Sequence, residues 1–227
     1  MTFFGEIVEP VSRTIWEDWD DAIPNCEYSK LQWECPTEIN KEIDTFFIID
    51  GKHLVHFIDL QSQLLELINE IKEIGLKLFE IKTLNKYLCV VKDYNIVLSS
   101  EIVELLQPYL ETCRNVITIQ TNPMSEYRST QVQIQPCLVR GIYTSAELVS
   151  SRYEFPRLEQ PNILSGVAAG VITLREQLNL KGIALLCYIE YTEYYQVEEL
   201  QKLLNSLDIG PIFQSSTSSV LSSNLYI

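Results

Sequence analysis

The sequence predicts a single-domain α/β sandwich, with a central mixed sheet flanked by helices and a flexible C-terminal tail. Short apolar runs of strand length alternate along the chain with segments whose apolar residues recur at helical spacing. The chain has 227 residues, 46% of them hydrophobic, which is enough for one sizeable core. We therefore expect an acidic segment packed on the domain over 1–44, the α/β domain over 45–209, and a Ser-rich tether over 210–227.

The charge balance narrows the range of partners. The chain carries 31 acidic and 17 basic residues, a net charge of −14, which repels nucleic acid and anionic membrane surfaces. Residues 1–50 hold 12 of the acidic residues. This part is either a solvated face or a segment that meets a basic partner, and Trp16, Trp19 and Trp33 would anchor it to the domain.

Compartment and membrane association also follow from composition. Six cysteines are scattered without a Cys-x-x-Cys pair, and the start of the chain does not read as a signal peptide. A reduced intracellular compartment fits this pattern, with Cys89 and Cys187 as small buried hydrophobes. The mainly apolar stretch from Ile163 to Leu174 is too short to span a bilayer, so we expect a buried helix there.

The first half of the domain is predicted to open with a strand at Thr45–Asp50. Asp50-Gly51 lies between two apolar runs, which is typical of a hairpin and would make 53–58 the antiparallel partner. Residues 61–74 repeat at helical spacing and Gly75 ends the repeat, which predicts a helix. Two strands are predicted next, at 76–82 and 87–92.

The second half continues the alternation. Ser99 or Ser100 is expected to cap a helix whose core face includes Ile102, Leu106 and Leu110, and Pro108 should bend or shorten it. The polar residues 121–160 are expected to form long loops. The remaining predicted elements are a strand at 115–120, a helix at 163–178, a strand buried on both faces at 183–189, and a last helix from Val197 to Leu207.

Groups that could carry catalysis are sparse. His53 and His56 are the only histidines, and on a strand they would face opposite sides, so a metal site is not expected. The chain has no Gly-x-Ser-x-Gly elbow and no glycine-rich phosphate loop. We therefore expect no catalytic residue, no metal and no cofactor, although paired carboxylates could still meet in the fold.

The C-terminal tail is the most distinctive feature. Seven of the nine residues 215–223 carry hydroxyl groups, which is typical of a flexible tether. The chain then ends in Leu225-Tyr226-Ile227, where nothing local can bury three large side chains. These residues are the candidate binding site, since capture of a terminal carboxylate is an established mode of peptide recognition. The alternative is that the tail folds back on its own domain.

Three short segments together carry a family resemblance. They are Thr2-Phe3-Phe4-Gly5-Glu6, Leu158-Glu159-Gln160-Pro161-Asn162-Ile163 and Asn224-Leu225-Tyr226-Ile227. With these segments in this order, the chain resembles the proteasome assembly chaperone 1 family. The resemblance covers the whole length in outline and about fifteen residues in detail.

The resemblance implies a non-enzymatic chaperone. It would form a heterodimer with a related subunit, proteasome assembly chaperone 2, and promote assembly of the α ring from 20S proteasome α-type subunits. The ending resembles the hydrophobic-Tyr-any motif that docks between α subunits: Leu225 would fill the apolar part of the pocket, Tyr226 would pack on its wall, and the Ile227 carboxylate would pair with a lysine. The implied location is the cytoplasm, with the nucleus as a second compartment.

Two other functions remain open from the sequence. A proteasome activator that opens the gate could use the same tail. A small-molecule enzyme on a nucleoside-phosphorylase-like sandwich belongs to a different class, and it would need a polar pocket in which charged groups converge.

Overall fold

The computed structural model describes most of the second of the two compact units into which the chain divides, 1–30 and 31–227. The described residues are 30–35, 43–51, 58–60, 64–82, 85–92, 94–129, 137–148, 153–189, 194–209 and 213–215. Trp16, Trp19, His53 and His56 lie outside them. Trp33 packs edge-on against Tyr109, with ring centroids 6.5 Å apart, as expected of an anchor.

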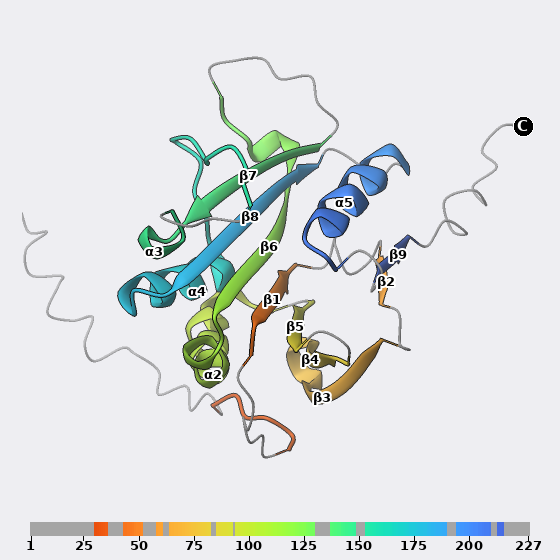
Figure 1. Cartoon of the computed structure of the whole chain (residues 1–227), viewed down its shortest axis with the longest axis vertical. Helices are drawn as coiled ribbons and strands as arrows, with labels where there is room; N and C mark the ends of the chain where they lie inside the picture. Colours follow the sequence, from red (N-terminus) through yellow and green to blue (C-terminus); the bar gives the residue numbers. More distant parts are fainter. Residues whose placement is uncertain are drawn as a thin grey trace, which may run out of the picture. The chain divides into compact units, whose positions relative to one another are not determined.

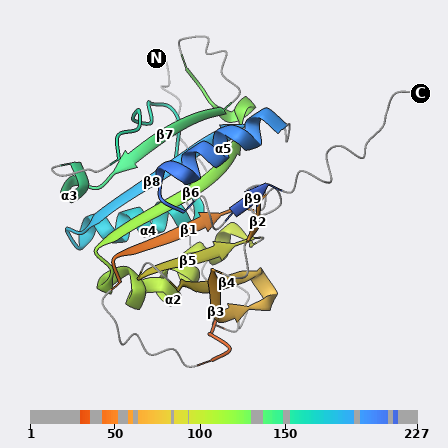
Figure 2. The ribbon, with the colours of Figure 1, turned by 45° about the vertical axis from the view of Figure 1, so that its right-hand side comes forward.

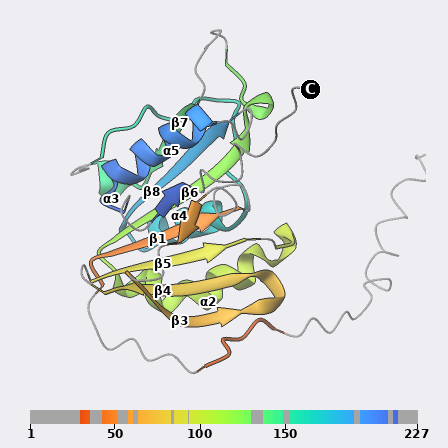
Figure 3. The ribbon, with the colours of Figure 1, turned by 90° about the vertical axis from the view of Figure 1, so that its right-hand side faces the viewer.

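A mixed seven-stranded sheet forms the framework, in the order β3-β4-β5-β1-β6-β8-β7 (Figure 3). The strands β5, β1, β6 and β8 are parallel to one another, and the pairs at both rims are antiparallel. The predicted mixed sheet is therefore confirmed. In sheet order, the strands are β3 (Leu65–Ile71), β4 (Leu76–Ile81), β5 (Lys86–Val91), β1 (Thr45–Asp50), β6 (Asn115–Pro123), β8 (Lys181–Ile189) and β7 (Cys137–Tyr143).

Helices cover both faces of this sheet. Helices α2 (Ser99–Thr112) and α4 (Gly166–Gln177) lie on one face, and α5 (Tyr194–Ser206) lies on the other (Figures 1 and 2). The shorter elements are η2 (Lys72–Ile74), η3 (Ile96–Leu98), η4 (Met124–Glu126) and α3 (Ser145–Leu148). No helix among the described residues is long and apolar enough to cross a membrane.

Strand β1 shows how the sequence divides the core between the two faces. All six of its residues are buried. Successive side chains of a strand point to opposite faces. Phe46 and Ile48 accordingly pack in the cluster that contains α2 and α4, whereas Phe47 and Ile49 pack in the cluster that contains α5. A continuous apolar run is therefore the pattern expected of a strand covered on both sides.

Arg175 joins α4 to the end of α2 and the start of β8. Its side chain is fully buried. Its guanidinium donates to the carbonyl oxygens of Cys113 at 3.0 Å, Arg114 at 2.9 Å and Lys181 at 2.9 Å, and also to that of Leu110. Because carbonyl groups at the end of a helix lack partners within the helix, Arg175 satisfies acceptors that would otherwise be buried unpaired. Burial lowers the pKa of this guanidinium.

Two predicted elements of the first half are wrong. Strand β1 cannot form a hairpin with the segment after it, because β5 and β6 occupy both of its edges and run parallel to it. The segment predicted as a helix over 61–74 contains strand β3. The register between β3 and β4 shifts between Leu67 and Asn69. An irregularity of this kind interrupts the alternation of side chains, and the spacing then imitates a helical repeat. Gly75 does end the segment, in a left-handed turn with φ 60°.

The helices and strands of the second half of the domain agree with the prediction better than those of the first half. Helix α2 continues through Pro108 to Thr112, and its N-cap is Leu98 without a side-chain hydrogen bond, so the predicted serine cap is wrong. Strand β7 lies inside the region predicted as long loops. Helix α4 begins at Gly166, three residues later than predicted. The buried face of α2, the buried strand at 183–189 and the last helix are confirmed.

Candidate functional site

The predicted docking residues Leu225, Tyr226 and Ile227 lie outside the described residues. The last described element before them is β9 (Phe213–Ser215), which pairs antiparallel with β2 (Ile58–Leu60) in a separate two-stranded sheet. The register places Ile58 opposite Ser215 and Leu60 opposite Phe213. Three residues of the predicted tether are therefore hydrogen-bonded to the domain.

Helix α5 holds the chain that leads to β9. Its residues Leu200, Leu203 and Leu204 are buried in the core cluster on their face of the sheet, followed by Leu207 and Ile209. Pulling this segment away would expose several large apolar side chains, each worth about 1.5–3 kcal/mol of burial. The C-terminal residues after Ser215 thus start from a point that is fixed on the domain.

The segment Leu158–Ile163, one of the three that carry the resemblance, is built around Glu159. Arg140 of β7 donates from Nε to Glu159 at 3.0 Å, and its Nη2 donates to the Tyr127 hydroxyl at 3.1 Å. Tyr127 in turn donates to Glu159. Burial opposes ionisation of Glu159, but the hydrogen bonds from Tyr127 and Arg140 outweigh it and hold the pKa below its usual range. The carboxylate therefore stays charged at neutral pH.

Asn162 makes the second link of this segment. Its side-chain oxygen accepts from the backbone N–H of Arg128 at 2.8 Å, and its amide donates to the carbonyl oxygens of Arg128 and Glu159, each at 2.8 Å. Leu158 and Leu164 flank these polar links and pack on the buried cluster of Leu138, Leu186 and Tyr188. The segment thus packs on β7 and β8 on the same face of the sheet as α2 and α4, over a part of that face that the two helices do not cover. This is a structural role.

At the carboxyl ends of the parallel strands, Asp50 joins β1 to the start of α4. Tyr94 donates from its hydroxyl to Asp50 Oδ2 at 3.1 Å, and the backbone N–H of Ala168 donates to the same oxygen at 3.4 Å. The N–H of Val167 donates to the Tyr94 hydroxyl at 3.0 Å. Gly166 has φ +69°, and a Cβ there would lie 2.4 Å from the Tyr94 hydroxyl. Only glycine fits so close an approach in this conformation. We call these five residues the Asp50 link.

Burial raises the pKa of Asp50 to about 6, although the hydrogen bonds from Tyr94 and Ala168 act in the opposite direction. A carboxyl group with such a pKa could exchange a proton near neutral pH. However, Asp50 is only 2% exposed, and its Oδ2 is already engaged by Tyr94 and Ala168. The negative end of the side chain also faces the positive end of the α4 dipole. The arrangement fits a structural link better than an acid–base site.

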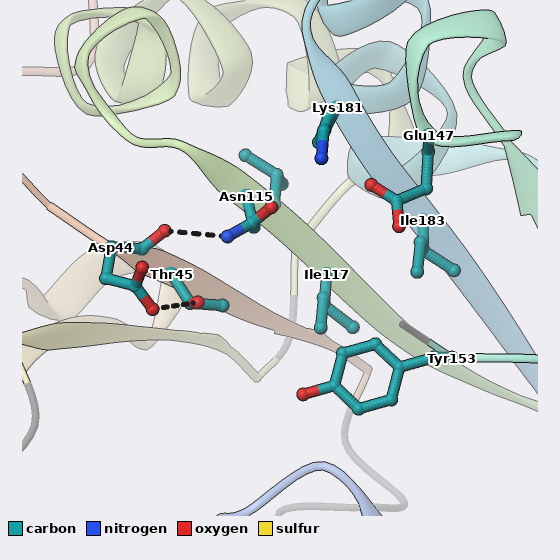
Figure 4. Close-up of a pocket in the computed structure, with 9 residues that line it drawn as sticks. Asp44, Thr45, Asn115, Ile117, Glu147, Tyr153, Lys181 and Ile183 are labelled. Carbon is teal, nitrogen blue, oxygen red and sulfur yellow. Dashed lines mark hydrogen bonds between the residues drawn. The ribbon is translucent and has the colours of Figure 1, made fainter. Parts of the chain in front are cut away.

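At the opposite, amino ends of β1, β6 and β8 lies a cavity of about 180 Å³ (Figure 4). Asn115 Nδ2 donates to the carbonyl oxygen of Asp44 at 3.2 Å, and Thr45 Oγ1 donates to Asp44 Oδ2 at 2.9 Å. The residues that line the cavity are Asp44, Thr45, Asn115, Val116, Ile117, Glu147, Tyr153, Lys181 and Ile183. No group of three or more metal-binding side chains occurs in the described part of the chain.

Neither the Asp50 link nor the cavity was expected from the sequence. Asp50 and Tyr94 are 44 positions apart, and Asp50 and Ala168 are 118 positions apart. Gly166 falls inside the helix predicted over 163–178, so nothing in the sequence indicated its left-handed conformation.

Comparison with solved structures supports the fold. PbaA of Pyrococcus furiosus, an archaeal homolog of proteasome-assembly chaperone, aligns with a TM-score of 0.50 at 15% identity and covers 81% of this chain and 88% of its own. The chain has the fold of PbaA. This likeness agrees, at the level of fold, with the family resemblance seen in the sequence. No protein-family model matches the sequence, and no curated protein matches it.

Two further solved structures align less closely. A protein with unknown function from Thermoplasma acidophilum gives a TM-score of 0.48 at 10% identity, covering 74% of this chain and 76% of that one. PbaB of Pyrococcus furiosus, an archaeal proteasome activator, gives 0.42 at 13% identity, covering 75% and 96%. The fold comparison rests on PbaA.

Proposed function

We propose that this chain is a non-enzymatic chaperone for assembly of the 20S proteasome α ring, which docks through Leu225-Tyr226-Ile227 into a pocket between α subunits. The observation that carries the proposal is the fold shared with PbaA, an archaeal homolog of proteasome-assembly chaperone. The terminal segments that resemble the chaperone 1 family support it from the sequence. In this proposal a related subunit, chaperone 2, pairs with the α/β domain, and the complex works in the cytoplasm, with the nucleus as a second compartment.

The pairing of β9 with β2, which holds the chain just before the C-terminal residues, suits such a docking role. Because β9 pairs with β2, only the twelve residues after Ser215 separate the domain from the end of the chain. A chain of that length reaches at most about 40 Å when fully extended. Docking of the terminal residues would therefore hold the domain close to the surface of the ring, where the body of the protein can make further contacts.

The decisive experiment is deletion of Leu225-Tyr226-Ile227, followed by measurement of binding to purified α rings. Loss of two large apolar side chains and a paired carboxylate should weaken ring binding by at least about a hundredfold. Pairing with the partner chaperone should stay intact, which shows that the domain still folds. Ring binding that is unchanged by the deletion contradicts the docking role.

Two variants refine the test. Amidation of the C-terminus keeps every side chain and removes only the charge, so a smaller loss of affinity is expected if a lysine pairs with the carboxylate. Asn224→Ala serves as the matched control, since it alters the position just before the motif, and it should bind the ring as the wild type does.

The two other functions predict different readouts. A gate-opening activator would stimulate peptide hydrolysis by mature 20S particles, whereas an assembly chaperone should not. A nucleoside-phosphorylase-like enzyme would bind phosphate, but the cavity at the amino ends carries Asp44 and Glu147 against one Lys181, a lining that disfavours an anion of high charge. Soaking with nucleosides and phosphate should accordingly give no ordered ligand.

A further inference from the structure

The cavity at the amino ends of β1, β6 and β8 has the size of a small organic molecule. Its volume of about 180 Å³ is comparable to cavities that hold a benzene ring, so it has room for roughly six to nine non-hydrogen atoms. It lies at the opposite end of the sheet from the carboxyl ends, where α/β folds usually bind their ligands. None of the residues that line it belongs to the C-terminal segment that carries the proposed docking function.

Charged groups of both signs border this cavity. Lys181 and Glu147 are both directed toward it in Figure 4, and Asp44 lies across from them. Within the part of the chain that the structure describes, no hydrogen bond or ion pair engages the Lys181 ammonium or the Glu147 carboxylate. Glu147 is only 5% exposed. The other two charged groups, Asp44 and Lys181, are half-buried.

The floor of the cavity is apolar. Ile117 of β6 and Ile183 of β8 are each at most 2% exposed, and the ring of Tyr153 lies beside them (Figure 4). Asn115 donates one N–H to the Asp44 carbonyl, and no described residue accepts its second N–H, which is therefore available to a ligand. A ligand here would thus meet acceptors, donors and an apolar surface within one small volume.

We propose that this cavity binds a small zwitterion, a free α-amino acid with a branched aliphatic side chain. The ammonium group of the ligand would face Glu147 and Asp44, its carboxylate would face Lys181 and the free N–H of Asn115, and its side chain would lie on Ile117 and Ile183. This assignment pairs each charged group that borders the cavity with a group of opposite charge. It does not depend on the docking role of the tail.

The test compares probes that share the same branched four-carbon portion, on the full chain, by calorimetry or ligand-observed NMR. L-Valine carries both charges, isobutylamine lacks the carboxylate, and 3-methylbutanoate lacks the ammonium. L-Valine should bind with a dissociation constant in the millimolar range, and each of the other two should bind at least about tenfold more weakly, because each loses charge-assisted hydrogen bonds.

Matched variants locate the binding. Lys181→Met and Glu147→Gln should each weaken L-valine by about tenfold or more while leaving the melting temperature close to that of the wild type. Lys77→Met and Glu73→Gln change exposed residues of β4 and η2 and should leave L-valine binding unchanged. Deletion of the last three residues should also leave it unchanged, which separates this proposal from the docking role.

Three outcomes would overturn the assignment. The first is that L-valine fails to bind at the highest soluble concentration, which would make the cavity a space for water. The second is that isobutylamine binds as tightly as L-valine, which would make it a simple cation site. The third is that Lys77→Met weakens L-valine as much as Lys181→Met, which would place the binding elsewhere.

Discussion

The polar side chains at the two ends of the parallel strands differ in whether they have hydrogen-bond partners. At the carboxyl ends, the Asp50 carboxylate accepts hydrogen bonds from Tyr94 and Ala168. Gly166, which has no side chain, allows Tyr94 to lie close to the backbone there. At the amino ends, Glu147 and Lys181 border an open cavity without such partners among the described residues. Changes at the first end should therefore affect stability, whereas changes at the second should affect ligand binding.

The largest effect on stability is expected from Gly166→Ala. The new Cβ would lie 2.4 Å from the Tyr94 hydroxyl and 3.3 Å from Asp50 Oδ2, in a left-handed conformation. Overpacking and the unfavourable backbone together should lower the free energy of unfolding by about 3 kcal/mol. Urea denaturation measures this loss.

Gly75→Ala is the matched control for that variant. Gly75 has φ +60°, but among the described residues a Cβ there meets only Lys92 Cβ, at 3.2 Å. It should cost about 1–2 kcal/mol from the backbone alone. Equal losses for the two variants would mean that the Asp50 link adds nothing to the backbone cost.

A smaller effect of opposite sign is expected from Asp50→Asn at pH 7.5. The folded pKa of Asp50 is about 6, above the ordinary value of 3.8, so the folded state holds a proton that the unfolded state has already released between these pH values. Stability therefore falls as the pH rises from about 4 to about 6, and the cost of the buried charge persists above pH 6.

The Asn side chain is neutral and can still accept from Tyr94 and Ala168. It should raise the free energy of unfolding at pH 7.5 by roughly 1–3 kcal/mol, and the difference between variant and wild type should vanish near pH 4. Urea denaturation across this pH range measures it. A difference that does not change with pH would show that the charge of Asp50 carries no cost.

The smallest effect on stability is expected at the cavity. Glu147→Gln removes a charge that borders an open cavity and accepts no hydrogen bond from the described residues, so the free energy of unfolding should change by less than about 1 kcal/mol. The same variant should weaken L-valine binding. A stability loss as large as that of Gly166→Ala would show that the two ends of the sheet do not differ in this way.

Elements with a strong local pattern were predicted well. Strand β1 begins and ends where its apolar run does, and the apolar stretch of β8 is buried along its length. Strand β3 was mistaken for a helix because the irregular register between Leu67 and Asn69 disturbs the alternation on which strand prediction depends. Strand β7 was missed because it lies within a polar, proline-punctuated stretch, 121–160.

The candidate sites also differ in how far a local pattern in the sequence reveals them. The docking motif Leu225-Tyr226-Ile227 was found because it is contiguous and chemically unusual, and it stays a prediction because it lies outside the described residues. The cavity could not be found, because Asp44, Glu147 and Lys181 come from three separate regions of the chain. The segment Leu158–Ile163 was interpreted from the sequence as structural, and its contacts with Arg140 and Arg128 agree with that interpretation.

The sequence by itself determined the class of the fold, the burial of strands such as β1, and the chemistry of the C-terminal residues, because each depends on the order of neighbouring residues. Only the tertiary structure decided that β1 pairs on both sides with parallel strands, that Asp50 meets the start of α4, and that charges of both signs border one cavity. These contacts join residues tens of positions apart, and their energies depend on burial and distance, which the order of residues along the chain does not specify.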